Sequence, residues 1–192
     1  MGDVCMSYTP RLDDTGILNN FHWYSDNPFY IAGYGMPNCT CYAWGRFWEI
    51  GDPNSTGEHK PTELPTYDGG EWWQEALDDG YYQTGQLPQL GAVICFQDNY
   101  GGSGHVAIVE EINQLTGEIT CSNSAYGGTY FFLTTIAPDN LLRYDWSHYT
   151  FQGFIYNPYA DQPIPPTPTT IKKKSFPWTI FTKKIRQKRR GQ

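Results

Sequence analysis

The sequence predicts an α+β fold in which an antiparallel sheet is combined with some helix. Aromatic residues make up 17% of the 192 residues, and 20 Gly and 14 Pro predict a fold rich in turns. Residues 42–50 form a helix-like run, and several short apolar runs beyond residue 90 are separated by Gly-containing turns. The length is sufficient for one domain with its own core.

Aromatic side chains gather in the first part of the chain, which otherwise reads as an irregular lead-in over residues 1–37. We expect them mainly to cap the core, although aromatic faces also suit a sugar- or peptide-binding groove. The residues concerned are Phe21, Trp23, Tyr24, Phe29 and Tyr30.

Cys39 stands at the entrance to the helix predicted over residues 38–50, after a Gly/Pro cluster at 33–37. The unpaired N–H groups and the dipole of a first helical turn stabilise an anion. A thiolate is the nucleophilic form of cysteine, so we expect this position to lower the pKa of Cys39. Arg46, two turns further on, is expected to have a structural role, either on the surface or paired with an acid.

The remaining elements follow from composition and apolar patterning. Residues 51–70 read as a loop, and residues 72–77 as a short helix that ends at a Gly. Strands are then expected within residues 87–96 and at 104–112, 119–124, 130–136 and 149–156.

His105 lies at the beginning of a predicted strand, directly after a Gly-rich turn, where catalytic residues often lie. It is distant from Cys39 in sequence, but the two would form a nucleophile–base pair if they meet in space. The next strand forms a hairpin with it, which would place Asn123 beside His105 as the group that orients the imidazole. His148 is a weaker alternative base.

The five cysteines, an odd number without regular spacing, argue against a disulfide framework. Cys95 lies within an apolar run and is expected to be an inert core thiol. The Cys39-Thr40-Cys41 spacing is narrower than structural zinc sites normally use. The sequence therefore predicts neither a metal nor a cofactor.

The charge distribution divides the chain. Residues 1–161 hold four Lys or Arg and all 20 acidic residues, whereas residues 162–192 hold nine cations and no acid. We expect a catalytic domain at 1–160, a Pro-rich linker at 161–171 and a basic tail at 172–192 with interleaved aromatic residues. No apolar run is long enough to cross a membrane, and the N-terminus has no signal-peptide pattern.

Six ordered motifs within residues 30–158 resemble the CHAP domain, a family of cysteine, histidine-dependent amidohydrolases and peptidases. The motifs are Asn-Cys-Thr-x-Tyr-Ala-Trp-Gly-Arg, Trp-Trp, Pro-x-x-Gly-Ala-Val, Gly-His-Val-Ala-Ile-Val-Glu, Ser-Asn-Ser-x-Tyr and Gly-Phe-Ile-Tyr-Asn-Pro. The resemblance implies a papain-like α+β fold in which the helix that carries the cysteine packs on an antiparallel sheet.

The resemblance also implies the roles of individual residues. Cys39 matches the nucleophile, His105 the general base and Asn123 the third position, where other members often carry Glu. Asn38, with the backbone N–H of Cys39, is a candidate for the oxyanion hole. Cys41 stands where another residue is usual and is an alternative nucleophile. Some members bind calcium through an Asp-rich loop before the cysteine, but residues 30–35 contain no carboxylate, so none is expected here.

The function implied is hydrolysis of an amide bond in peptidoglycan, as an amidase or an endopeptidase, by a phage-encoded endolysin or a virion-associated lysin. The other interpretation is a catalytically inactive structural or wall-binding phage protein. Through Lys172–Arg190 the tail would bind an anionic wall polymer, a membrane or a phage tail protein. Without a signal peptide, we expect the protein in the host cytoplasm until lysis, or in the virion tail, acting on the cell wall.

Overall fold

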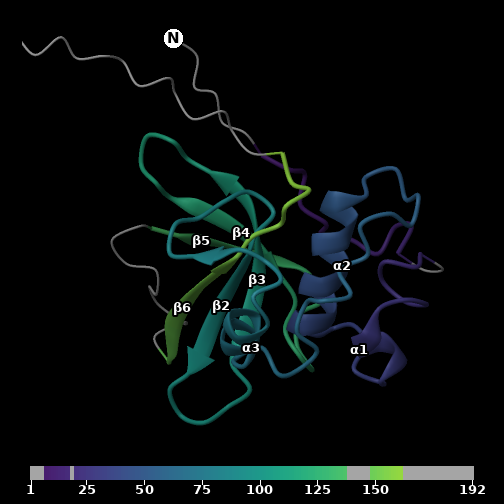
Figure 1. The fold of residues 1–192 in the computed structure, drawn as a ribbon, viewed down its shortest axis with the longest axis horizontal. Coiled ribbons are helices and arrows are strands. Elements are labelled where there is room, and N and C mark those ends of the chain that lie inside the picture. The colour runs from purple at the N-terminus through teal and green to yellow at the C-terminus, as the bar shows by residue number, and fades with distance from the viewer. Residues whose placement is uncertain (1–6, 18–19, 138–147, 162–192) are drawn as a thin grey trace, which may run out of the picture.

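The computed structural model describes residues 7–17, 20–137 and 148–161. Six strands form one antiparallel sheet in the order β1-β6-β2-β3-β4-β5. The strands are β1 (Thr84–Gly85), β2 (Val93–Asp98), β3 (His105–Ile112), β4 (Ile119–Asn123), β5 (Phe132–Ile136) and β6 (Tyr149–Ile155). The predicted α+β fold class, with the helix that carries Cys39 against an antiparallel sheet, is confirmed (Figure 1).

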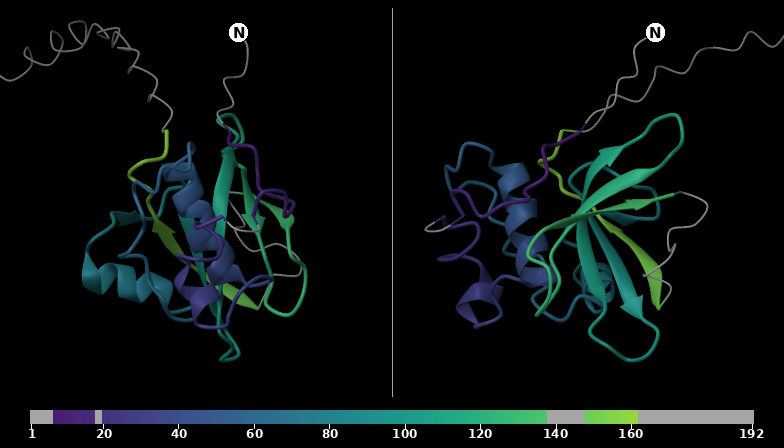
Figure 2. Two further views of the ribbon diagram at one scale, coloured as in Figure 1. Left: turned by 90° about the vertical axis from the view of Figure 1, so that its right-hand side faces the viewer. Right: turned by 180° about the vertical axis from the view of Figure 1, so that it is seen from behind.

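The three helices are α1 (Pro28–Ile31), α2 (Cys39–Gly51) and α3 (Trp72–Asp79). Helix α2 lies against one face of the sheet and contacts β3 and β4 (Figure 2). Helix α3 contacts β6 and β2, which are nearer the β1 edge of the sheet. The short helix α1 corrects the expectation that the lead-in is wholly irregular. Asn27 caps it, because its side chain accepts hydrogen bonds from the N–H groups of Phe29 and Tyr30.

Alternation along β3 supplies both faces of the sheet with core side chains. Val106 and Ile108 join the core between the sheet and α2, whereas Ala107 and Val109 join the core on the opposite face. Helix α2 is buried nearly all round, which requires cover on its outer side as well. That cover comes partly from the lead-in: Trp23 and Phe29 are buried, as the core interpretation of its aromatic cluster predicted, while Tyr30 is exposed.

A buried ionic network fixes α2 on β3. Arg46 donates from Nε and Nη2 to the two carboxylate oxygens of Glu110, at 2.8 and 2.9 Å. Ser122 on β4 donates to the same carboxylate at 2.6 Å, and Glu49 accepts from Arg46 Nη1 at 2.6 Å. Glu110 is fully buried, so the expected structural role of Arg46 is confirmed, as a paired cation. The network sets the position of the Cys39 helix relative to the strand that begins at His105.

The segments predicted as linker and basic tail begin at residue 161, and residues 162–192 lie outside the described residues. Cys39, Cys41, Cys95 and Cys121 are all unpaired in the described part of the chain. Cys95 is fully buried, as expected for a core thiol. No helix within 7–17, 20–137 or 148–161 combines the length and the apolar character needed to cross a membrane.

Candidate active site

The N-terminus of α2 holds Cys39 in a defined position. Asn38 is the N-cap, and its side-chain oxygen accepts from the backbone N–H groups of Thr40 and Cys41 at 2.8 and 3.1 Å. The N–H of Asn38 donates to Ser124 Oγ at 3.0 Å, just beyond β4. The residue before the cysteine is thereby tied to the strand end that carries Asn123.

His105 and Asn123 lie side by side, as the predicted hairpin of β3 and β4 requires. His105 Nε2 and Asn123 Oδ1 are 3.0 Å apart, and both residues are buried. The amide nitrogen of Asn123 donates to the carbonyl oxygen of Cys121 at 3.0 Å, which fixes the orientation of the amide. Oδ1 therefore accepts from Nε2–H, and the lone pair of the neutral imidazole is on Nδ1.

The thiol of Cys39 lies beside the first residues of β3. Its sulfur lies close enough to the backbone N–H of Val106, the residue that follows His105, for that N–H to lower the pKa of the thiol. The ring of Tyr149, at the beginning of β6, stacks near the imidazole with centroids 5.9 Å apart. Helix α2 and strands β3, β4 and β6 thus bring Cys39, His105, Asn123 and Tyr149 to the same end of the sheet.

Burial determines the protonation state of the pair. It raises the pKa of Cys39 above its usual value, although the N–H groups of Val106, Thr40 and Cys39 itself oppose this rise. The expectation that the helix entrance would lower this pKa is wrong in direction, because loss of hydration outweighs the N–H groups. Burial also lowers the pKa of His105 to about 4, against a smaller opposing effect of the bond to Asn123. At rest, both the thiol of Cys39 and the imidazole of His105 are therefore neutral.

Cys41, the alternative nucleophile, lies in a different environment from Cys39. It is fully buried within the core, whereas Cys39 is half-buried. Burial raises the pKa of Cys41 to about 12. Its carbonyl oxygen accepts from the side chain of Asn27 at 3.0 Å, which ties it to the base of α1. This geometry favours Cys39 for contact with a substrate.

The other predicted residues have definite positions as well. The Asn38 side-chain oxygen accepts the hydrogen bonds of the helix cap, and the amide nitrogen is the donor that could bind an oxyanion; that role stays a prediction. His148 precedes β6, and its charge lowers the pKa of His105, which places it close to the site without a hydrogen bond to Asn123. Within the described residues, no group of three or more His, Cys, Asp or Glu is arranged to hold a metal ion.

Sequence reasoning missed the loop that closes the site on the α3 side. The N–H of Gly70 donates to the carbonyl oxygen of Ser103 at 2.7 Å. A Cβ on Gly69 would lie 3.2 Å from the backbone of His105, and one on Gly104 would lie 2.3 Å from the Cα of Gly70. Asp68, exposed just before these glycines, is close enough for its charge to raise the pKa of Cys39. The Gly-Gly pair was the available signal, since two backbones meet closely only where side chains are absent.

The fold and the site together define a papain-like cysteine–histidine site, with a thiol at the entrance of a helix and an imidazole from the adjoining sheet. The family model described as CHAP domain matches residues 29–125, about half of the chain. The chain therefore belongs to the CHAP domain family, and the range matched contains Cys39, His105 and Asn123. Membership supports a peptidoglycan hydrolase or amidase-type function, with the chemistry of a cysteine, histidine-dependent amidohydrolase or peptidase and peptidoglycan as the substrate.

Proposed function

We propose that this protein hydrolyses an amide bond of peptidoglycan through a thioester on Cys39. His105 is the general base in this proposal, and Asn123 orients it. The observation that carries the proposal is the 3.0 Å contact between His105 Nε2 and Asn123 Oδ1. It lies at the end of the sheet where the N–H of Val106 is near enough to the Cys39 thiol to lower its pKa. With Nε2–H donated to Asn123, Nδ1 is the nitrogen that would remove the proton.

The first step starts from the neutral pair. Nδ1 of His105 takes the proton from Cys39 as the sulfur attacks the carbonyl carbon, and the carbonyl oxygen becomes an oxyanion. The backbone N–H of Cys39 and the amide nitrogen of Asn38 are the proposed donors to that oxyanion. The imidazolium then donates its proton to the amine nitrogen as the C–N bond breaks, which leaves a thioester on Cys39.

The second step releases the acyl group. His105 Nδ1 takes a proton from water, whose oxygen attacks the thioester carbon, and the C–S bond breaks. The proton returns to the sulfur, so the thiol is restored and one carboxylic acid and one amine are formed. Asn123 is neutral, so it holds the imidazole in position but stabilises its cation less than a carboxylate would.

The test is digestion of purified peptidoglycan by the wild type, Cys39→Ala and the matched variant Cys41→Ala, with folding checked by circular dichroism. We expect the wild type and a folded Cys41→Ala to release material and Cys39→Ala to release none. Mass spectrometry of the ends distinguishes two activities. Muramic acid freed of peptide identifies an amidase, whereas new peptide amines with the lactyl-amide link intact identify an endopeptidase. Release by Cys39→Ala would refute the assignment of the nucleophile.

We further propose a phage-encoded lysin, either a free endolysin held in the host cytoplasm until lysis or a component of the virion tail. The support is the resemblance to a family common in phage lysins, together with the concentration of nine cations in residues 162–192. Lys172–Arg190 would bind an anionic wall polymer, a membrane or a phage tail protein. Sedimentation with teichoic acid, with anionic vesicles and with purified virions, each at low and high salt, separates these partners.

The competing proposal is a structural or wall-binding protein of the same fold without catalytic activity. The intact set of Cys39, His105 and Asn123 favours the enzyme. Binding to cell walls without release of fragments by the wild type, on several wall types, would favour the inactive protein.

A further inference from the structure

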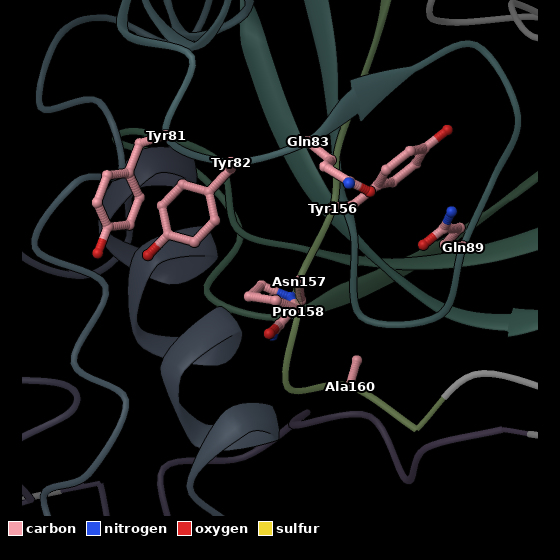
Figure 3. A pocket seen from close by; sticks show the side chains of 8 residues that line it. All are labelled: Tyr81, Tyr82, Gln83, Gln89, Tyr156, Asn157, Pro158 and Ala160. Atoms are coloured by element: carbon pink, nitrogen blue, oxygen red, sulfur yellow. The ribbon is translucent and has the colours of Figure 1, made fainter.

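A concave site lies away from the catalytic residues, where the segment after α3 meets the segment after β6. It is an open pocket of about 310 Å³. Tyr81 and Tyr82 form one wall, and Gln83, Gln89 and Tyr156 stand opposite, with Asn157 and Pro158 between them (Figure 3). No Asp, Glu, Lys or Arg is among the residues that line it, although the described part of the chain is rich in acids.

Hydrogen bonds make the floor and one wall of the pocket rigid. Asn157 donates to the carbonyl oxygen of Phe47 at 2.8 Å, near the C-terminal end of α2. The hydroxyl of Tyr156 donates to the carbonyl oxygen of Leu87 at 2.9 Å, and the N–H of Tyr156 donates to the carbonyl oxygen of Gln83 at 2.8 Å. A pocket held in place in this way loses little conformational entropy when a ligand binds.

The rim of the pocket, in contrast, presents groups that water can reach. Tyr81 is 66% exposed, Gln83 is exposed and Gln89 is half-buried. The pocket thus presents two kinds of surface. One is the flat apolar face of an aromatic ring, and the other consists of uncharged amides that donate and accept hydrogen bonds. A sugar has the matching chemistry, with C–H groups on one face and hydroxyl or acetamido groups around its edge. A charged ligand would find no counter-ion in the lining.

The pocket and the thiol lie at opposite ends of the sheet. Tyr149, beside His105, begins β6, and Tyr156 follows its end. Seven residues of extended strand separate these tyrosines by roughly 20 Å. A ligand that occupies both sites must therefore be a polymer, and peptidoglycan joins sugars to the peptides that contain the amide.

We propose that the pocket formed by Tyr81, Gln89 and Tyr156 binds a neutral N-acetylated sugar of the glycan strand. Its bound sugar anchors the polymer while a peptide is presented to Cys39. The identity of the polymer rests on the proposed function, but sugar binding itself can be measured without turnover.

The first test titrates the N-acetylglucosamine trimer into full-length Cys39→Ala, followed by NMR. We expect saturable binding. Adding Tyr81→Ala should weaken it about tenfold, as loss of one aromatic stacking surface does, and Gln89→Ala should weaken it as well. Tyr100→Ala is the matched control, because Tyr100 is 86% exposed on the loop after β2, and it should not change binding. Absence of binding at millimolar sugar, or equal binding by Tyr81→Ala, would overturn the proposal.

The second test compares two substrates in the protein with Cys39 intact. Tyr81→Ala should raise KM for a glycan-linked peptide and leave KM for the same peptide without sugar unchanged. An equal change for both substrates would overturn the proposal. If the wild type cleaves neither substrate, the proposed hydrolase function fails, and the titration alone still decides whether the pocket binds sugar.

Discussion

Burial of a neutral His105 makes the stability of the domain depend on pH in a calculable way. In the unfolded chain a histidine has a pKa near 6.5, whereas burial lowers the pKa of His105 in the folded protein to about 4. Between these values the unfolded chain binds the proton and the folded protein does not, so the free energy of unfolding falls as the pH falls. Above pH 6.5 both states are neutral, and the contribution vanishes.

The magnitude follows from the two pKa values. At pH 4.5 the unfolded histidine is almost fully protonated, while about three quarters of folded His105 remains neutral. This difference in protonation lowers the free energy of unfolding by about 2.5 kcal/mol relative to pH 7.5. This is a large part of the net stability of a typical domain.

The assay is urea unfolding of the wild type and His105→Gln at pH 7.5 and 4.5. Other titrating groups, including buried His22 and the acids, are common to both proteins, so the difference between their two pH dependences isolates His105. Between pH 7.5 and 4.5, we expect the free energy of unfolding to fall by about 2.5 kcal/mol more in the wild type than in His105→Gln. His59→Gln, at an exposed loop position, controls for replacement of a histidine as such. Equal losses in the wild type and His105→Gln would refute the conclusion that His105 is held neutral by burial.

Three further predictions concern the groups around the site. Glu110→Gln should lower the free energy of unfolding by about 3 kcal/mol in urea titrations, because buried Arg46 loses the carboxylate that it contacts twice and keeps only that of Glu49; an unchanged midpoint would contradict the structural role of the network. Asn123→Ala should reduce kcat about 100-fold and move the acidic limb of the pH–rate profile lower, since the bond to Asn123 raises the pKa of His105; Asn123→Asp should move the limb higher. Iodoacetamide should modify Cys39 in the native protein and leave Cys41 unmodified, as peptide mapping will show; the reverse pattern would exchange their roles.

Much of the fold could be predicted because its signals are local. The helix at 39–51 follows a Gly/Pro cluster and begins at an Asn cap, and β3 and β4 are apolar runs on either side of a Gly turn. The two-residue strand β1 was missed, since Thr84 and Gly85 carry no strand pattern and pair with β6 only because the chain passes its edge.

The residues that form the site could be predicted from the sequence, but the pKa of Cys39 could not. Hairpin geometry was enough to place Asn123 beside His105. The pKa of Cys39 depends instead on how many atoms exclude water from the thiol, and the segments that do so are far apart in sequence. The exposed carboxylate of Asp68 also raises the pKa of Cys39, and no residue near Cys39 in the sequence indicates this effect.

The contact between Gly70 and Gly104 has a mechanical consequence. One glycine precedes α3 and the other precedes His105, and at this point the two backbones touch without any side chain between them. The segment leading to α3 therefore cannot swing outward as an independent flap without breaking the hydrogen bond to Ser103. The backbone before α3 is thus coupled to the turn that leads into His105, and we expect changes of shape on this side of the site to come from exposed side chains such as Asp68.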